Sequence, residues 1–387
     1  MKIVVATDSF KGSLSATEVC QAIKEGILRA DPACQVETLP IADGGEGTLE
    51  AMKLSSGGEM ISVPCVNPLG EKIRGKYLVL ADGKTAVIEM AQAAGLCLIA
   101  REQQNPLYTT TYGVGEIILA ALDSGYRKFI VCIGGSATVD AGIGMLQALG
   151  FRFLNKAGEE IASGGLAIAN LRKIEVSGAD KRLPECSFQV ACDVDNLICG
   201  PRGAARVFAP QKGATPEMVE ILEDNLRHFS EIVNSDLGID ISDVKGGGAA
   251  GGIGASLFAF LNAQLVSGVE LVLDSMDFST KLQGADLIIT GEGQLDEQTA
   301  YGKVPMGVAR RAKEKGLPVI ALAGAIGTDY ANLSPLGIDA AVSIVNRPMS
   351  LEEAMADAGL LLSQCSEAVI RLLKISLPCR RANSLPE

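Results

Sequence analysis

Five stretches of the chain place carboxylate, hydroxyl and amine side chains beside glycines, directly after short apolar runs. They are DSFKGSLS (8–15), ADGGEGT (42–48), GGSATVD (134–140), CDVDN (192–196) and TGEGQLDEQTAYGK (290–303). Short apolar runs rich in Val and Ile predict buried parallel strands. In open α/β sheets, the loops at the carboxyl ends of the strands carry the ligand site. The five stretches therefore predict an active site assembled from the whole length of the chain.

The chain contains one histidine and no tryptophan in 387 residues, so it has almost no side chains for catalysis or metal binding by histidine. A two-histidine metal site is excluded, and a Ser-His-Asp triad is disfavoured. His228 lies in a segment of helical periodicity and points away from its apolar face, which predicts a surface position. The chemistry must come from Asp, Glu, Lys, Ser, Thr and backbone amides.

Carboxylates clustered with lysines suit a magnesium–nucleotide site, because hard oxygens bind Mg²⁺ and lysines neutralise phosphate. A solvated surface loop would explain any one such cluster, but not several at strand ends. The candidate binding or catalytic residues are Asp8, Ser9, Lys11, Ser13, Asp43, Gly44, Gly45, Glu46, Asp193, Asp195, Gly291, Glu292, Asp296 and Lys303.

Glycines and hydroxyls precede a predicted helix at Gly134, Gly135, Ser136 and Thr138. Amides and hydroxyls at a helix N-terminus favour an anion site, although a tight strand-to-helix turn would also require these glycines. A second glycine-rich tract, GGGAAGGIGAS (246–256), fits close ligand approach and close helix packing equally well. A GxxxxGK[ST] phosphate loop is absent from the sequence.

Strands alternate with helices at both ends of the chain. Strands are predicted at 2–7, 35–41, 286–290, 318–323 and 339–345, and helices at 16–30, 47–56, 303–316 and 350–374. Ser15 with Glu18, and Ser350 with Glu353, match the capping box of a helix start. This alternation predicts a doubly wound, Rossmann-like parallel sheet.

The middle of the chain has a different predicted pattern. Strands near 59–66, 74–81 and 84–90 follow one another without helices between them, and 171–208 is also expected to be strand-rich. Length favours two domains. We predict a Rossmann-like α/β domain from residues 1–60 and 285–387, with a mixed α/β domain inserted at 61–284. The cleft between them is expected to hold the ligands.

A formal net charge of −12 argues against a nucleic-acid surface. The first residues have no long apolar run, and no uncharged stretch reaches the roughly 18 residues that span a bilayer. The ten cysteines show no CxxC spacing and are expected to be buried free thiols. These features predict a cytoplasmic protein.

The long motifs together resemble a known family. DSFKGSLSA, ADGGEGT, GGSATVDAGIGMLQALG, ACDVDNLICGPRGAARVFAPQKGA and TGEGQLDEQTAYGKVP occur in the order typical of the bacterial glycerate kinases that phosphorylate the 2-hydroxyl. The resemblance extends from Met1 to about Arg371. It implies ATP-dependent, Mg²⁺-assisted conversion of D-glycerate to 2-phosphoglycerate, and a two-domain α/β build with an inserted domain.

Residue roles are our own inference. We expect Asp193 to be the general base, because a carboxylate near the 2-hydroxyl can take its proton. Lys11 and Asp296 complete the expected catalytic set, and Asp195 with Asp193 is expected to bind the metal. The guanidinium group of Arg202 or Arg206 is a candidate for bidentate binding of the glycerate carboxylate, and Lys212 is a candidate phosphate contact.

Two other classes stay open at this level. A non-catalytic two-lobed anion-binding protein should carry an export signal, which the sequence does not show. Another phosphate enzyme for small hydroxy acids, such as a nucleotide-dependent dehydrogenase, should have a glycine-rich turn directly after a clear strand. ATP-dependent turnover of glycerate in a coupled assay separates the three.

The predicted cleft carries a prediction of its own. The lobes should close over ATP and glycerate, excluding water that would otherwise hydrolyse ATP. Small-angle scattering should show compaction when an ATP analogue and glycerate bind together. A profile unchanged by both ligands would contradict closure.

Overall fold

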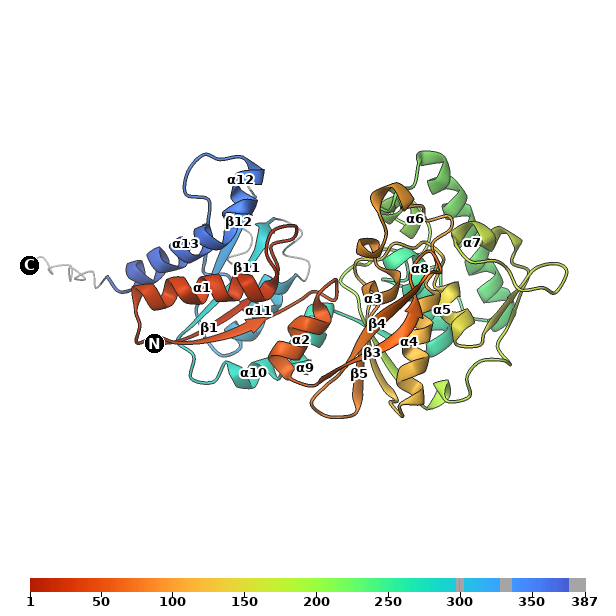
Figure 1. Ribbon diagram of the computed structural model, residues 1–387, viewed down its shortest axis with the longest axis horizontal. Coiled ribbons are helices and arrows are strands. Elements are labelled where there is room, and N and C mark those ends of the chain that lie inside the picture. Colours follow the sequence, from red (N-terminus) through yellow and green to blue (C-terminus); the bar gives the residue numbers. More distant parts are fainter. Residues whose placement is uncertain (297–298, 300–302, 328–335, 376–387) are drawn as a thin grey trace, which may run out of the picture. The chain divides into compact units, whose positions relative to one another are not determined.

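The computed structural model describes residues 1–296, 299, 303–327 and 336–375. The chain forms two compact units (Figure 1). Met1–Pro40 and Ser279–Glu387 form the first, here called the end unit, and Ile41–Phe278 form the inserted unit. The divisions therefore fall at 40/41 and 278/279, not at the expected 60/61 and 284/285. Helix α2 (Thr48–Ser56) accounts for the first difference, because it packs against strands and a helix of the inserted unit.

The end unit contains a five-stranded sheet in which all pairings are parallel, as predicted. Its order is β13 (Ala340–Ser343), β12 (Val319–Ile326), β11 (Leu287–Leu295), β1 (Lys2–Thr7), β2 (Gln35–Pro40). The strand order reverses direction between β1 and β11. Open α/β sheets bind ligands outside the carboxyl ends of the strands at such a switch point.

Helices cover both faces of this sheet. Helices α1 (Ala16–Ala30) and α13 (Ala358–Leu373) pack together over one face, where Ile3, Val5 and Ile289 join their apolar side chains in one core. Helix α11 (Val304–Lys313) packs on the same strands without joining that core. Both predicted capping boxes are confirmed, at the start of α1 and of α12 (Leu351–Ala356).

The inserted unit is built on a mixed six-stranded sheet. Its order is β10 (Gln264–Val266), β9 (Ser187–Ala191), β6 (Lys128–Cys132), β5 (Thr85–Glu89), β4 (Lys72–Val79), β3 (Glu59–Val66). The pairings β3–β4 and β4–β5 are antiparallel and the others are parallel. The predicted helix-free run of strands is thereby confirmed.

Helices and one small ribbon complete this unit. The helices are α2, α3 (Ala91–Ala94), α4 (Tyr112–Asp123), α5 (Ile143–Ala148), α6 (Ala204–Phe208), α7 (Pro216–Leu237), α8 (Ala249–Leu261) and α9 (Gly268–Ser275). Helix α10 (Phe278–Lys281) begins at the last residue of this unit, and its other residues belong to the end unit. Strands β7 (Arg152–Leu154) and β8 (Lys173–Glu175) form the ribbon. The expectation that 171–208 is strand-rich was wrong, because only β8 and β9 are strands there. Its cysteines and alanines pack in turns and in α6.

The glycine tract at 246–256 serves packing. Ala250, Gly251 and Gly252 have positive φ within α8, and a Cβ on Gly251 would lie 2.1 Å from the carbonyl oxygen of Thr138. The amide of Ala141 donates to the carbonyl of Gly251 at 3.0 Å. Of the two readings of this tract, the contacts favour close packing of backbone on backbone.

The one histidine lies at the surface of α7, as expected. His228 is half-buried, and its Nε2 lies 2.7 Å from the carbonyl oxygen of Leu171. Within the described part of the chain, the structure contains no helix with the length and apolar character needed to cross a bilayer.

Candidate active site

Asp193, which we expect to be the general base, lies just beyond the end of β9. Its Oδ1 accepts hydrogen bonds from the Ser267 hydroxyl and the Gly268 amide, both at 2.9 Å. Its Oδ2 is buried and has no hydrogen-bond partner among the described residues. Burial raises the pKa of Asp193 to about 6, and the nearby charge of Asp43 acts in the same direction. The carboxylate is thus held in place through Oδ1, while Oδ2 is enclosed without a partner among the described residues.

The two glycine motifs around Asp43 and Gly134 meet beside Asp193. The Gly134 amide donates to the Gly44 carbonyl at 3.0 Å, and a Cβ on Gly134 would lie 2.5 Å from the Cα of Gly45. A Cβ on Gly268 would lie 2.7 Å from both Asp193 Oδ2 and the carbonyl oxygen of Asp43. The structure therefore joins these segments in one cluster, which we call the Asp193 site. It consists of Asp43, Gly44, Gly45, Gly134, Asp193, Ser267 and Gly268.

The loop after β6 continues from this site into the protein interior. Gly135 is exposed, with Glu46 beside it, whereas Ser136 and Thr138 are buried. Beneath the loop, Lys212 Nζ donates to the Ser136 hydroxyl at 2.6 Å and to the Thr138 carbonyl at 2.7 Å. Burial lowers the pKa of Lys212 to about 7.

Three expected contacts, Ser136, Thr138 and Lys212, are corrected by this burial. The side chain of Lys212 is fully enclosed, so its ammonium supports the loop and does not reach a phosphate in this structure. Thr138 has no exposed surface, and Asp140 below it accepts from Thr111 and Gly142. The residues of the loop that a ligand can approach are Gly134 and Gly135.

The expected partners Asp195, Arg202 and Arg206 do not join the Asp193 site. Asp195 has a 70% exposed side chain and faces Arg202 at 3.5 Å. Both terminal nitrogens of Arg206 are engaged by Glu220 on α7, at 2.5 and 2.8 Å. Because a bidentate fork can serve only one carboxylate at a time, the pairing removes Arg206 as a preformed glycerate clamp.

A second cluster, the Lys303 site, lies in the end unit at the carboxyl ends of β1 and β11. Asp8 is buried and accepts from the Ser9 amide at 2.6 Å, and its own amide donates to the Gly291 carbonyl at 3.0 Å. Lys303 Nζ lies 3.3 Å from Glu292 and 3.7 Å from Asp296. Thr299 donates to Glu292, and burial raises the pKa of that carboxyl.

A cavity of about 550 Å³ opens at this second cluster. Asp8, Ser9, Lys11, Ser13, Glu292, Asp296 and Lys303 line it, as do apolar residues that follow β13. Ser13 is tied to the wall, because its hydroxyl donates to the Met355 carbonyl at 2.6 Å. Seven of the expected residues therefore share one cavity.

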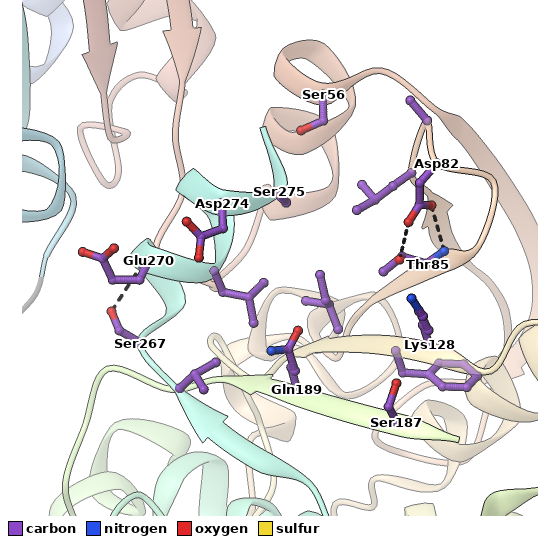
Figure 2. A pocket seen from close by; sticks show the side chains of 16 residues that line it. Ser56, Asp82, Thr85, Lys128, Ser187, Gln189, Ser267, Glu270, Asp274 and Ser275 are labelled. Carbon is purple, nitrogen blue, oxygen red and sulfur yellow. Dashed lines mark hydrogen bonds between the residues drawn. The ribbon is translucent and has the colours of Figure 1, made fainter. Parts of the chain in front are cut away.

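The inserted unit has a different cavity, of about 650 Å³, shown in Figure 2. Ser267 and Glu270 of the α9 start lie on one side of it, and Lys128 and Ser187 lie on the other. Ser267 is its only residue in common with the Asp193 site. Thr85, Lys128 and Ser187 are the first residues of their strands, so the cavity reaches the amino ends of the sheet, away from the usual ligand position.

Sequence reasoning did not identify Ser267, Gly268 and Glu89. Ser267 and Glu270 carry a capping signal, S-x-x-E, after a short apolar run, which could have marked a strand end. Glu89 is buried and accepts from the amides of Gly47 and Leu49 at 3.3 and 3.0 Å. It thereby supports the Asp43–Gly45 loop at the start of α2.

A parallel α/β sheet with carboxylates and lysines at its strand ends is compatible with an enzyme that binds and transfers phosphate. A model of the glycerate kinase family matches residues 3–374 of this chain. The chain belongs to the glycerate kinase family, and so to the phosphotransferases.

Individual relatives agree with this assignment. The chain is 46% identical to the glycerate kinase of Bacillus subtilis (strain 168), over 97% of this chain and 98% of that protein. It is 47% identical to the glycerate 2-kinase of Escherichia coli (strain K12), over 92% of this chain and 94% of that one. A crystal structure described as glycerate kinase 2 from Salmonella typhimurium LT2 superposes with a TM-score of 0.83, at 46% identity, covering 97% of this chain and 98% of that one.

Proposed function

We propose that this protein transfers the terminal phosphoryl group of ATP to the 2-hydroxyl of D-glycerate, giving 2-phosphoglycerate and ADP. Asp193 carries the proposal, because it is a strand-end carboxylate with a raised pKa and one unpartnered, buried oxygen. The name of the E. coli relative, a glycerate 2-kinase, supports the position of transfer.

In the proposed reaction, the 2-oxygen of glycerate forms a bond to the terminal phosphorus. The bond between that phosphorus and the bridging oxygen breaks, and the electron pair leaves with ADP. The hydroxyl proton passes to the Asp193 carboxylate, while Ser267 and Gly268 hold Oδ1. Phosphoryl transfer needs positioning and charge neutralisation more than covalent chemistry, so it can be carried out by carboxylate, lysine and hydroxyl side chains without histidine.

Mg²⁺ would neutralise charge on the ATP phosphates. Within the described residues, no cluster of three or more His, Cys, Asp and Glu side chains could hold a metal ion. Mg²⁺ is commonly held by one or two carboxylates together with substrate phosphates, so a larger cluster of protein ligands is not required. Asp193 was also expected as a ligand, but its single unpartnered oxygen cannot both coordinate a metal and accept the proton.

The product distinguishes this proposal from transfer to another hydroxyl. A phosphate on C2 of glycerate couples to one carbon-bound hydrogen and gives a doublet in the phosphorus NMR spectrum. A phosphate on the terminal carbon couples to two and gives a triplet. A triplet, or no ATP-dependent product, would overturn the proposal.

Replacing Lys303 or Lys11 by Met should weaken the ATP-dependent step. Charge-assisted hydrogen bonds to phosphate contribute roughly 1.5–3 kcal/mol each, so kcat/KM for ATP should fall by about 10- to 100-fold. Binding of glycerate alone, measured by calorimetry, should be unchanged.

Lys313→Met is the matched control, since Lys313 pairs with Asp339 at the far end of α11 and does not line the cavity. It should leave kcat/KM for ATP within about twofold of wild type, as expected for a surface ion pair. Unchanged kinetics in both Lys11→Met and Lys303→Met would place the phosphates elsewhere, at the Gly134–Ser136 loop.

A further inference from the structure

The cavity of the Lys303 site has two chemically different halves, and both belong to the end unit. Its polar half is formed by the residues after β1 and β11, including Asp8, Lys11 and Lys303. Its apolar half is formed after β13, along α12 and at the start of α13 by Ile344, Val345, Met349, Leu351, Ala354, Met355 and Ala358.

Glycerate explains only the polar half. It has three carbons, each bearing oxygen, so it offers no apolar surface for seven apolar side chains. A cavity of about 550 Å³ lies within the range of roughly 300–1,000 Å³ that accommodates ligands of drug size. A molecule with a flat, weakly polar part and a charged part matches both halves.

From this match we infer that the apolar half of the cavity binds the adenine and ribose of the nucleotide, with the phosphates directed toward Lys11 and Lys303. This inference rests on the proposed use of ATP. Val345 and Met349 are half-buried, so an entering base can cover surface that is now exposed to water.

Position in the fold separates this cavity from the one in Figure 2. The end-unit cavity is lined by residues at the carboxyl ends of β11 and β12 and by the loops that follow β1 and β13, beside the switch point between β1 and β11. The Figure 2 cavity reaches strand starts and is lined by one lysine, Lys128, whereas two lysines, Lys11 and Lys303, line the end-unit cavity.

Two alanines on the same helix provide a matched pair of variants. Ala354 lines the cavity, whereas Ala356 on α12 is exposed and does not line it. Ala354→Phe should fill the apolar half and weaken ADP binding, measured by calorimetry, by about tenfold or more. Ala356→Phe should bind ADP as wild type does. Inorganic triphosphate should bind all three proteins equally, because its contacts lie in the polar half.

A second variant, which enlarges the cavity, tests the inference even if the Ala354→Phe protein does not fold. Met349→Ala should improve binding of N6-benzyl-ADP relative to ADP by about tenfold, because it vacates space beside the base. Wild-type ADP affinity in a folded Ala354→Phe protein, or no change in the analogue preference of Met349→Ala, would overturn the inference.

These experiments distinguish a failure of the inferred nucleoside site from a failure of the proposed function. If the wild type makes 2-phosphoglycerate while Ala354→Phe keeps its ADP affinity, the nucleoside site is wrong and the function stands. If ADP binding responds as expected but no 2-phosphoglycerate forms, the function is wrong and the nucleoside site stands.

Discussion

Asp193→Asn is expected to lower kcat by about 10²–10⁴, the usual loss when a positioned general base is removed. Asparagine can keep the Oδ1 contacts with Ser267 and Gly268, but its amide cannot take the proton as the carboxylate does. ATP and ADP affinity should stay nearly unchanged. Steady-state kinetics combined with calorimetric nucleotide binding separates the two quantities.

Asp195→Asn is the control, because Asp195 lies two residues away, is exposed and contacts Arg202. Its kcat should remain within a few-fold of wild type, as expected for a surface ion pair worth about 0–1 kcal/mol. A folded Asp193→Asn enzyme with near-normal kcat would remove Asp193 from the role of base. An equal loss in both variants would instead indicate that the loop as a whole positions the substrate.

The pH profile tests the same assignment without a mutation. Burial disfavours the charged carboxylate, so Asp193 becomes able to accept a proton only as pH rises through its pKa of about 6. Below that pH the protonated acid cannot act as a base, and kcat/KM for glycerate should fall with decreasing pH. An acidic limb near 4, the ordinary range of an exposed Asp, would point to another carboxylate.

Local sequence patterns predicted much of the fold because they report on local physics. The alternation of strands and helices near both ends gave the parallel sheet of the end unit, and the S-x-x-E pairs at Ser15 and Ser350 gave helix starts. The grouping of Asp43, Gly134 and Asp193 also follows from local cues, since each stands just after an apolar strand.

Local sequence patterns do not predict which tertiary contacts a side chain makes, or to which of the two units a segment belongs. Residues after β2 read as part of the first domain, yet Asp43 and α2 belong to the inserted unit because Glu89 accepts from the amides that open α2. Arg206 is basic and near Asp193 in sequence, but Glu220 on the next helix engages it. These contacts depend on tertiary packing, which overrides position along the chain.

Lys212 is the most consequential case. A charged residue in the sequence PQKG is expected at the surface, but the structure buries it. Pro210–Lys212 form one 3-10 turn, and Gly213 follows with φ of 93°, so the chain reverses and directs the lysine inward. There it meets the Ser136 hydroxyl and the Thr138 carbonyl. A lysine so enclosed is a positioning residue for the Gly134–Ser136 loop.

Lys212→Met should therefore destabilise the protein, by about 2–4 kcal/mol at pH 9, since two buried acceptors lose their donor. The size of this loss should depend on pH. The folded pKa of Lys212 is about 7, below the value of about 10.4 for an unfolded lysine, so the unfolded state binds more protons between these values. The stability of the wild type relative to Lys212→Met should accordingly rise from pH 7 toward pH 10, and be smallest below pH 7, where the buried ammonium must stay charged.

Urea unfolding of both proteins at pH 6.5 and pH 9 measures this difference directly, because groups remote from Lys212 titrate alike in the two chains. Lys156→Met, at an exposed turn, should show no such dependence and a change within about 0.5 kcal/mol. A loss for Lys212→Met that is equal at the two pH values, or larger at pH 6.5, would mean that the lysine is charged throughout and paired more strongly than its burial allows. With Asp140 buried nearby and its own pKa raised by burial, a pair of that strength would require both groups to ionise inside the protein, which the desolvation of each opposes.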